Sequence, residues 1–105
     1  MKILSIALIL LSTTCFANDY QPTAGASGAQ MFSEACAACH GDDGTGKFGL
    51  FFDLSTSTLL DAQMKETIQQ GGLMMPAFAN IKGKELDVLV TYIRSLGRVI
   101  AAKQK

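Results

Sequence analysis

Apolar positions along this chain recur at helical spacing, and no stretch alternates in the way a half-buried strand would. The strongest pattern predicts an amphipathic helix from residue 84 to about residue 100. Its apolar stripe consists of Leu86, Leu89, Val90, Ile93, Leu96, Val99 and Ile100. A second helix is predicted from about residue 59 to residue 70, where Leu60, Met64 and Ile68 are four positions apart and should face inward.

A third helix is predicted from about residue 26 to residue 39. Gly28, Phe32, Cys36 and Cys39 follow one another at spacings of four, four and three, so they can share one face. With no strand and no internal repeat, the pattern predicts an all-α fold of three or four short helices joined by long loops.

Turn-forming residues divide these helices. The glycine-rich stretch 41–52 is typical of a loop, and it contains no Gly-Lys-Ser/Thr sequence that would indicate a phosphate loop. Gly71 and Gly72 should end the second helix, and an irregular segment with Pro76 follows it. Candidate N-caps for the second helix are Ser55, Thr56, Ser57 and Thr58.

The first 17 residues are typical of a secretory signal peptide. Lys2 precedes a short apolar run, polar residues follow, and Ala17 provides a small residue at a cleavage site. The run is shorter than the roughly 20 apolar residues that span a bilayer. Lipid attachment to Cys15 is disfavoured by the polar residues before it. We therefore expect an exported, periplasmic protein, with a flexible lead-in at 18–25 and one domain at 26–105.

Composition narrows the class of protein. Cleavage would leave 88 of the 105 residues, with eight basic and nine acidic side chains, which indicates neither nucleic-acid binding nor an anionic membrane surface. It would also remove Cys15, and the two remaining cysteines cannot build a disulfide framework. A domain this small usually needs some other staple for its core.

The sequence Cys36-Ala-Ala-Cys39-His40 allows three interpretations: disulfide exchange, a zinc site or covalent haem attachment. Exchange motifs of this kind are expected near a βαβ pattern, which is absent. Structural zinc needs about four ligands, and no second ligand pair follows. Haem attachment uses every residue, with two thioether links from the cysteines and His40 as an axial iron ligand. We therefore predict one covalently bound haem c.

His40 is the only histidine, so the sixth iron ligand must be another residue type. Thioether sulfur suits haem iron, and Met74 and Met75 are the candidates. We favour Met75, because Pro76 holds the preceding residue in an extended conformation. Met74 is kept as the alternative, with apolar packing as its other role. Met31 and Met64 lie at core-like helical positions.

At this point the chain resembles the small bacterial monohaem class I c-type cytochromes over residues 25–100. The resemblance rests on the motif at 36–40, on Met75-Pro-Ala-Phe78, and on two helix-packing pairs. These pairs are Gly28 with Phe32, and Leu89 with Tyr92. The resemblance implies that the first and last helices cross closely at Gly28.

The resemblance also implies that a backbone carbonyl after the histidine accepts its second ring N–H. Family members often have Gly-Pro-x-Leu there, and this chain has Gly49-Leu50-Phe51-Phe52, with Leu50 in the position of proline. A leucine carbonyl can accept the same hydrogen bond.

The function we expect is one-electron transfer by a monomeric periplasmic carrier that is not itself an enzyme. Its donor and acceptor would be other redox proteins in short-lived contact, with no nucleic acid and no stable membrane insertion. We expect Leu50 and five aromatic residues to bury the haem: Phe32, Phe48, Phe51, Phe52 and Phe78. Two alternatives stay open: an open-site haem enzyme or sensor, and a fixed haem subunit of a larger periplasmic oxidoreductase.

Overall fold

The computed structural model describes residues 19–47 and 52–103 of the chain. The predicted signal peptide, Cys15, Phe48, Leu50 and Phe51 lie outside these residues, as do the side chains of Val99 and Ile100. Within the described part no helix is long and apolar enough to cross a membrane.

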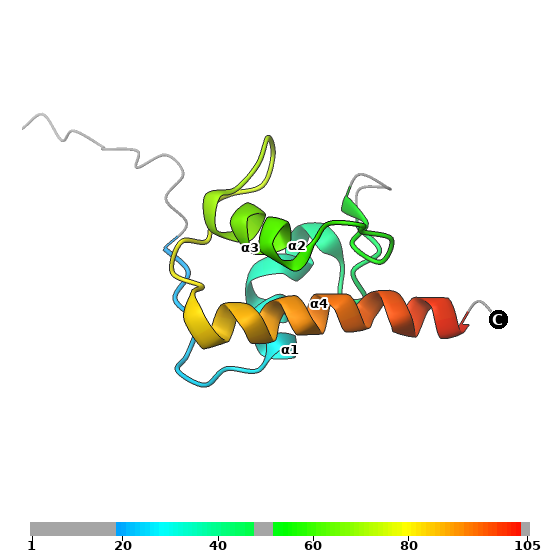
Figure 1. Cartoon of the computed structure of the whole chain (residues 1–105), viewed down its shortest axis with the longest axis horizontal. Helices are drawn as coiled ribbons and strands as arrows, with labels where there is room; N and C mark the ends of the chain where they lie inside the picture. Colours follow the sequence, from blue (N-terminus) through cyan, green and yellow to red (C-terminus); the bar gives the residue numbers. More distant parts are fainter. Residues whose placement is uncertain (1–18, 48–51, 104–105) are drawn as a thin grey trace, which may run out of the picture.

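Within residues 19–47 and 52–103 the structure has five helical segments, which confirm the all-α prediction. Figure 1 labels α1 to α4 among them. A continuous N-terminal helix contains α1 (Gly28–Met31), the π-helical turn η1 (Phe32–Cys36) and α2 (Ala37–His40). After a long loop come α3 (Asp61–Gln70) and the long C-terminal α4 (Gly83–Lys103). Both α1 and α3 pack against α4, which runs along the length of the molecule.

The crossing of α1 and α4 depends on the absence of a side chain at Gly28. A Cβ atom there would lie 2.5 Å from Cβ of Tyr92 and 2.8 Å from the carbonyl oxygen of Val88. The rings of Phe32 and Tyr92 pack 5.5 Å apart beside this contact, and Leu89 is fully buried in it. The helix-packing pairs that the resemblance implied are therefore confirmed.

A single apolar core joins the helices, and it contains most of the predicted stripe of α4. Its fully buried side chains are Met31, Phe32, Ile81 and Leu89. Burying a large apolar side chain stabilises a fold by roughly 1.5–3 kcal/mol, so these four contribute strongly. Met31 and Met64 are both buried, as their helical spacing predicted.

The N-terminal helix is not regular, which the sequence did not indicate. At η1 the N–H of Ala37 bonds to the carbonyl of Phe32, five residues earlier, so the turn is wider than an α-helical turn. The wider turn rotates the residues after it relative to α1. Phe32 packs on Tyr92 of α4, whereas Cys36 and Cys39 line a cavity. Phe32 and Cys36 still belong to the same buried core.

The start of α3 also differs from prediction. The N-cap is Leu60, in an extended conformation, and none of the four predicted Ser and Thr residues caps the helix. Leu60 is 68% exposed, because it lies outside the helix and does not follow its spacing. Its N–H donates to Oε1 of Gln63 at 3.0 Å. Arg94 of α4 secures the turn by bonding Asp61 and the carbonyl of Leu59.

Candidate functional site

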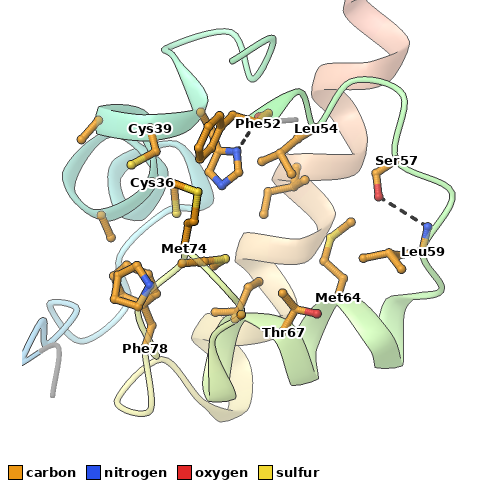
Figure 2. A pocket seen from close by; sticks show the side chains of 18 of the residues that line it. Cys36, Cys39, Phe52, Leu54, Ser57, Leu59, Met64, Thr67, Met74 and Phe78 are labelled. Carbon is orange, nitrogen blue, oxygen red and sulfur yellow. Dashed lines mark hydrogen bonds between the residues drawn. The ribbon is translucent and has the colours of Figure 1, made fainter. Parts of the chain in front are cut away.

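A cavity of about 420 Å³ lies between the N-terminal helix, α3 and the loop after α3 (Figure 2). Its size falls within the range of roughly 300–1,000 Å³ that is usual for cofactor sites. Cys36 and Cys39 occupy one side, Met64 and Thr67 come from α3, and Phe78 comes from the following loop. Other lining residues are Ala35, Ala38, His40, Phe52, Leu54, Ser57, Leu59, Ile68, Gly72, Leu73, Met74, Met75, Pro76 and Ile93.

The two cysteines lie one helical turn apart at the edge of this cavity. Cys36 is buried and Cys39 is exposed, and neither forms a disulfide. Burial, with a smaller contribution from the neighbouring Cys39, raises the pKa of the Cys36 thiol to about 12. At neutral pH this thiol is therefore protonated and a weak nucleophile, which argues against disulfide exchange. No cluster of three metal-binding side chains occurs among residues 19–47 and 52–103, so a zinc site has no support there.

The imidazole of His40 is held by the backbone of the loop that follows it. Nδ1 lies 2.6 Å from the carbonyl oxygen of Phe52. A carbonyl can only accept, so Nδ1 carries the proton and Nε2 keeps its lone pair available for a metal. The acceptor is Phe52 rather than the predicted Leu50. The sequence pattern alone did not show which residue after His40 brings its carbonyl back to the imidazole.

Backbone hydrogen bonds keep this turn in place. The N–H of Gly46 donates to the carbonyl of His40 at 2.8 Å, and the N–H of Lys47 donates to that of Cys39 at 3.1 Å. Gly41 ends α2 with φ 76° and ψ 159°, a backbone region that is essentially restricted to glycine. The chain can therefore turn sharply after His40 and return along the helix end.

The loop 71–78 forms a second wall of the cavity. Gly71 ends α3 as predicted, with φ 77°, and the N–H of Gly72 donates to the carbonyl of Met75 at 3.0 Å. The N–H of Phe78 then donates to the carbonyl of Ile68 at 2.8 Å, which fastens the loop to the end of α3. These two bonds define a short, closed loop at the cavity.

Both candidate methionines lie on this wall, in different environments. Met75 is half-buried and packs against the core, whereas Met74 is 67% exposed. Both line the cavity, so the structure brings each of them to the same site as His40 and the two cysteines.

Among the described residues, the aromatic wall differs in one member from the prediction, and Phe48 and Phe51 lie outside these residues. Phe52 and Phe78 line the cavity, but Phe32 does not, because it packs on Tyr92. Leu54, Thr67 and Ile68 were not predicted as wall residues. The spacing of Met64 and Ile68 showed a buried face on α3, but it could not show that part of this face borders a cavity.

Taken together, these residues fit a flat apolar cofactor that contains iron. The walls are almost entirely apolar, two thiols lie at one edge, and a single imidazole nitrogen and a thioether are available as ligands.

A comparison with protein families gives one match. The model described as cytochrome c oxidase, cbb3-type, subunit III matches residues 23–93, which is well over half of the chain and includes every wall of the cavity. No curated protein and no solved structure matched the chain. A cytochrome c domain binds haem and transfers electrons, in agreement with the resemblance and with the cytochrome c-like fold. The chain therefore belongs to the family of c-type cytochrome domains described as subunit III of cbb3-type cytochrome c oxidase.

Proposed function

We propose that this protein is a periplasmic one-electron carrier that holds a single haem c. Cys36 and Cys39 would hold the haem through thioether links, and His40 and Met75 would supply the nitrogen and the sulfur that bind its iron. The haem supplies a reversible Fe(II)/Fe(III) couple. All other parts of the proposal concern how the chain binds, orients and buries this group.

The observation that carries the proposal is the hydrogen bond between Nδ1 of His40 and the Phe52 carbonyl. It holds the imidazole in one tautomer and one orientation beside a cavity that both cysteines line. Such a bond also increases the basicity of the coordinating nitrogen. The same imidazole on an unrestrained loop would be a poorer ligand.

The apolar walls explain why electron transfer is favoured over catalysis. Among the described wall residues, the cysteines and His40 are the only ionisable groups, and the proposal uses all three for the haem. No acid or base is then left on these walls for proton transfer. A dry, apolar site with histidine and methionine ligands also favours the reduced state and raises the reduction potential.

Met75 is the proposed distal ligand because of its environment. Its side chain already packs against the core, so ordering it on the iron costs less conformational entropy than ordering the exposed Met74. With both axial positions filled, no open site remains for a substrate.

The cellular setting is part of the same proposal. Residues 1–17 direct export and are removed, and attachment takes place in the periplasm. The mature protein is a monomer that meets its donor and acceptor in small, short-lived contacts.

The test is export of the full chain in a host that matures c-type cytochromes, followed by intact mass and optical spectra. We expect residues 18–105 plus one haem that stays on the denatured chain, and low-spin spectra in both oxidation states. A long-wavelength absorption band should report the sulfur–iron bond in the ferric protein. Haem lost on denaturation would contradict covalent attachment, and a high-spin ferric spectrum would instead favour the open-site enzyme or sensor.

One observation favours a second candidate, a fixed haem subunit of a larger oxidoreductase. The matching family is described as a subunit of an oxidase. Size-exclusion chromatography of periplasmic and gently solubilised membrane fractions at physiological salt separates the two. Migration of the haem signal at the size of the mature chain supports a free carrier, and migration with a large complex supports the subunit.

A further inference from the structure

Through one side chain, Tyr20, the N-terminal segment before α1 contacts both the thiol-bearing helix and Phe78, a residue that lines the cavity. Its hydroxyl donates to Oε1 of Glu34 at 3.0 Å, and Glu34 lies on η1, two residues before Cys36. Its ring meets that of Phe78 edge to face, with centroids 6.4 Å apart. One residue therefore touches the thiol-bearing helix and the loop that contains Met74 and Met75.

Other contacts hold this segment on the fold. Pro22 and Ala26 are buried, and the N–H of Gly25 donates to Oε1 of Glu85 at the start of α4 at 3.3 Å. Ser27 caps α1 by accepting from the N–H of Gln30 at 3.1 Å. The segment that contains Tyr20 is thus held on the domain by contacts other than the bond between Tyr20 and Glu34.

Phe78 is the residue through which Tyr20 can act on the distal wall. It is 4% exposed, it lines the cavity, and its N–H is bonded to the carbonyl of Ile68. Only Ala77 and Pro76 separate it from Met75 along the chain. A shift of Phe78 would therefore move the end of the loop that presents the proposed distal ligand.

We propose that Tyr20 is a positioning residue, which clamps the loop 71–78 against the thiol-bearing helix and so restrains opening of the cavity on its distal side. The clamp has two parts: a hydrogen bond to Glu34 and a ring contact with Phe78. One of the two tests below, displacement of the sulfur ligand, rests on the proposed binding of Met75 to iron. The other test, hydrogen exchange of a backbone amide, does not. The raised pKa of Tyr20 keeps the phenol protonated, so the hydroxyl remains a donor at physiological pH.

The test uses the exported holoprotein, with its N-terminus checked by mass. Tyr20→Phe removes the hydroxyl and keeps the ring, and Glu34→Ala removes the acceptor. Tyr92→Phe is the matched control, because it removes a phenolic hydroxyl at the α1–α4 crossing, away from the loop. The first readout is the rate at which excess imidazole abolishes the sulfur–iron band of the ferric protein. The second is hydrogen exchange of the Phe78 amide.

We expect Tyr20→Phe and Glu34→Ala each to accelerate both processes by about three- to tenfold, the effect of losing one hydrogen bond of modest net free energy. The double variant should be no faster than either single variant, because both remove the same bond. Glu34→Gln keeps an acceptor and should restore most of the restraint. Tyr92→Phe should leave both rates unchanged.

Wild-type rates in Tyr20→Phe would overturn the proposal. So would equal acceleration of amide exchange at Leu89 in the α1–α4 contact, which would mean a general loss of stability. A wild-type ferric protein without the sulfur–iron band would refute Met75 ligation, and exchange at Phe78 would still decide for or against the clamp.

Discussion

At the scale of single residues, backbone hydrogen bonds position the side chains on both walls of the cavity. His40 is oriented by a carbonyl that lies twelve residues later, and Met75 is placed by a loop closed through its own backbone. Both groups depend on main-chain atoms. A substitution that removes only the sulfur of a methionine should therefore leave the loop backbone in place. Such substitutions can show which of the two neighbouring methionines binds the iron.

Met75→Leu keeps an apolar side chain of similar size and removes the sulfur. We expect complete loss of the sulfur–iron band and a lower reduction potential, because histidine–methionine ligation raises the potential. Met74→Leu is the matched control and should keep the band. Optical spectroscopy and a redox titration measure both effects. Loss of the band in Met74→Leu alone would move the ligand to Met74.

Tyr20 should ionise at an unusually high pH. Burial, followed by the hydrogen bond and charge of Glu34 and by Cys36, raises the pKa of its phenol from 10.0 to about 12. An unfolded tyrosine ionises near pH 10, so the stabilisation linked to Tyr20 is fully present below pH 10 and is lost as the pH rises towards 12. Ultraviolet difference titration of wild type against Tyr20→Phe isolates this group from Tyr92. Glu34→Gln should lower the pKa, and a wild-type value near 10 would contradict the assignment.

At the scale of elements, close approach decides where the helices and loops lie. The α1–α4 contact and the end of α3 each require a glycine, for different reasons. At Gly28 a side chain is excluded because α4 lies too close. At Gly71 a side chain is disfavoured both by close backbone atoms and by the positive φ.

Gly28→Ala should separate α1 from α4. The new Cβ would meet the base of Tyr92 and a backbone oxygen of Val88, neither of which is the free end of a flexible side chain. Overpacking of this kind costs about 1–3 kcal/mol. Urea unfolding of the holoprotein, followed by circular dichroism, measures the loss. An unchanged urea midpoint would contradict this need for space at Gly28.

Gly71→Ala should distort the loop 71–78. Its Cβ would lie 2.7 Å from the carbonyl oxygen of Met75, and its φ of 77° with ψ −178° falls in a region that is essentially glycine-only. Such strain costs about 1–3 kcal/mol. The expected result is a weakened sulfur–iron band together with lower stability in urea. An unchanged band would show that the loop does not transmit the strain to Met75.

At the scale of the whole molecule, the cavity borders the apolar core, and the two share several residues. It lies beside Cys36, Met64, Ile68 and Phe78, which are core residues as well as wall residues. A small domain with an unfilled cavity of this size loses apolar contacts along every wall. The cofactor should therefore contribute to folding as well as to electron transfer.

Cys36→Ala combined with Cys39→Ala should consequently give little folded protein on export. The variant loses both of the proposed attachment points, so under the proposed function the haem would no longer be a covalent part of the core. Circular dichroism and recovery from the periplasm measure the result, with wild type exported in parallel. A cooperative, helical apoprotein in good yield would refute this dependence.

The sequence by itself determined the helical periods and the thiol–imidazole motif, because each depends on residues close together in the chain or on a distinctive spacing. The close crossing at Gly28, Phe32, Leu89 and Tyr92 was expected only from the resemblance to c-type cytochromes, and the structure confirmed it. The sequence also determined the end of α3 at Gly71, because glycine at that position stops a helix locally.

Only the tertiary structure decided the features that depend on how distant segments meet. It formed a π-helical turn at Phe32–Cys36, selected the Phe52 carbonyl as the partner of His40, and left Leu60 exposed beside a turn that Arg94 holds. It also brought Tyr20 between Glu34 and Phe78. Each outcome depends on the path of a loop or the phase of a turn. Backbone hydrogen bonds can be satisfied in several such paths, so side-chain pattern alone does not select one.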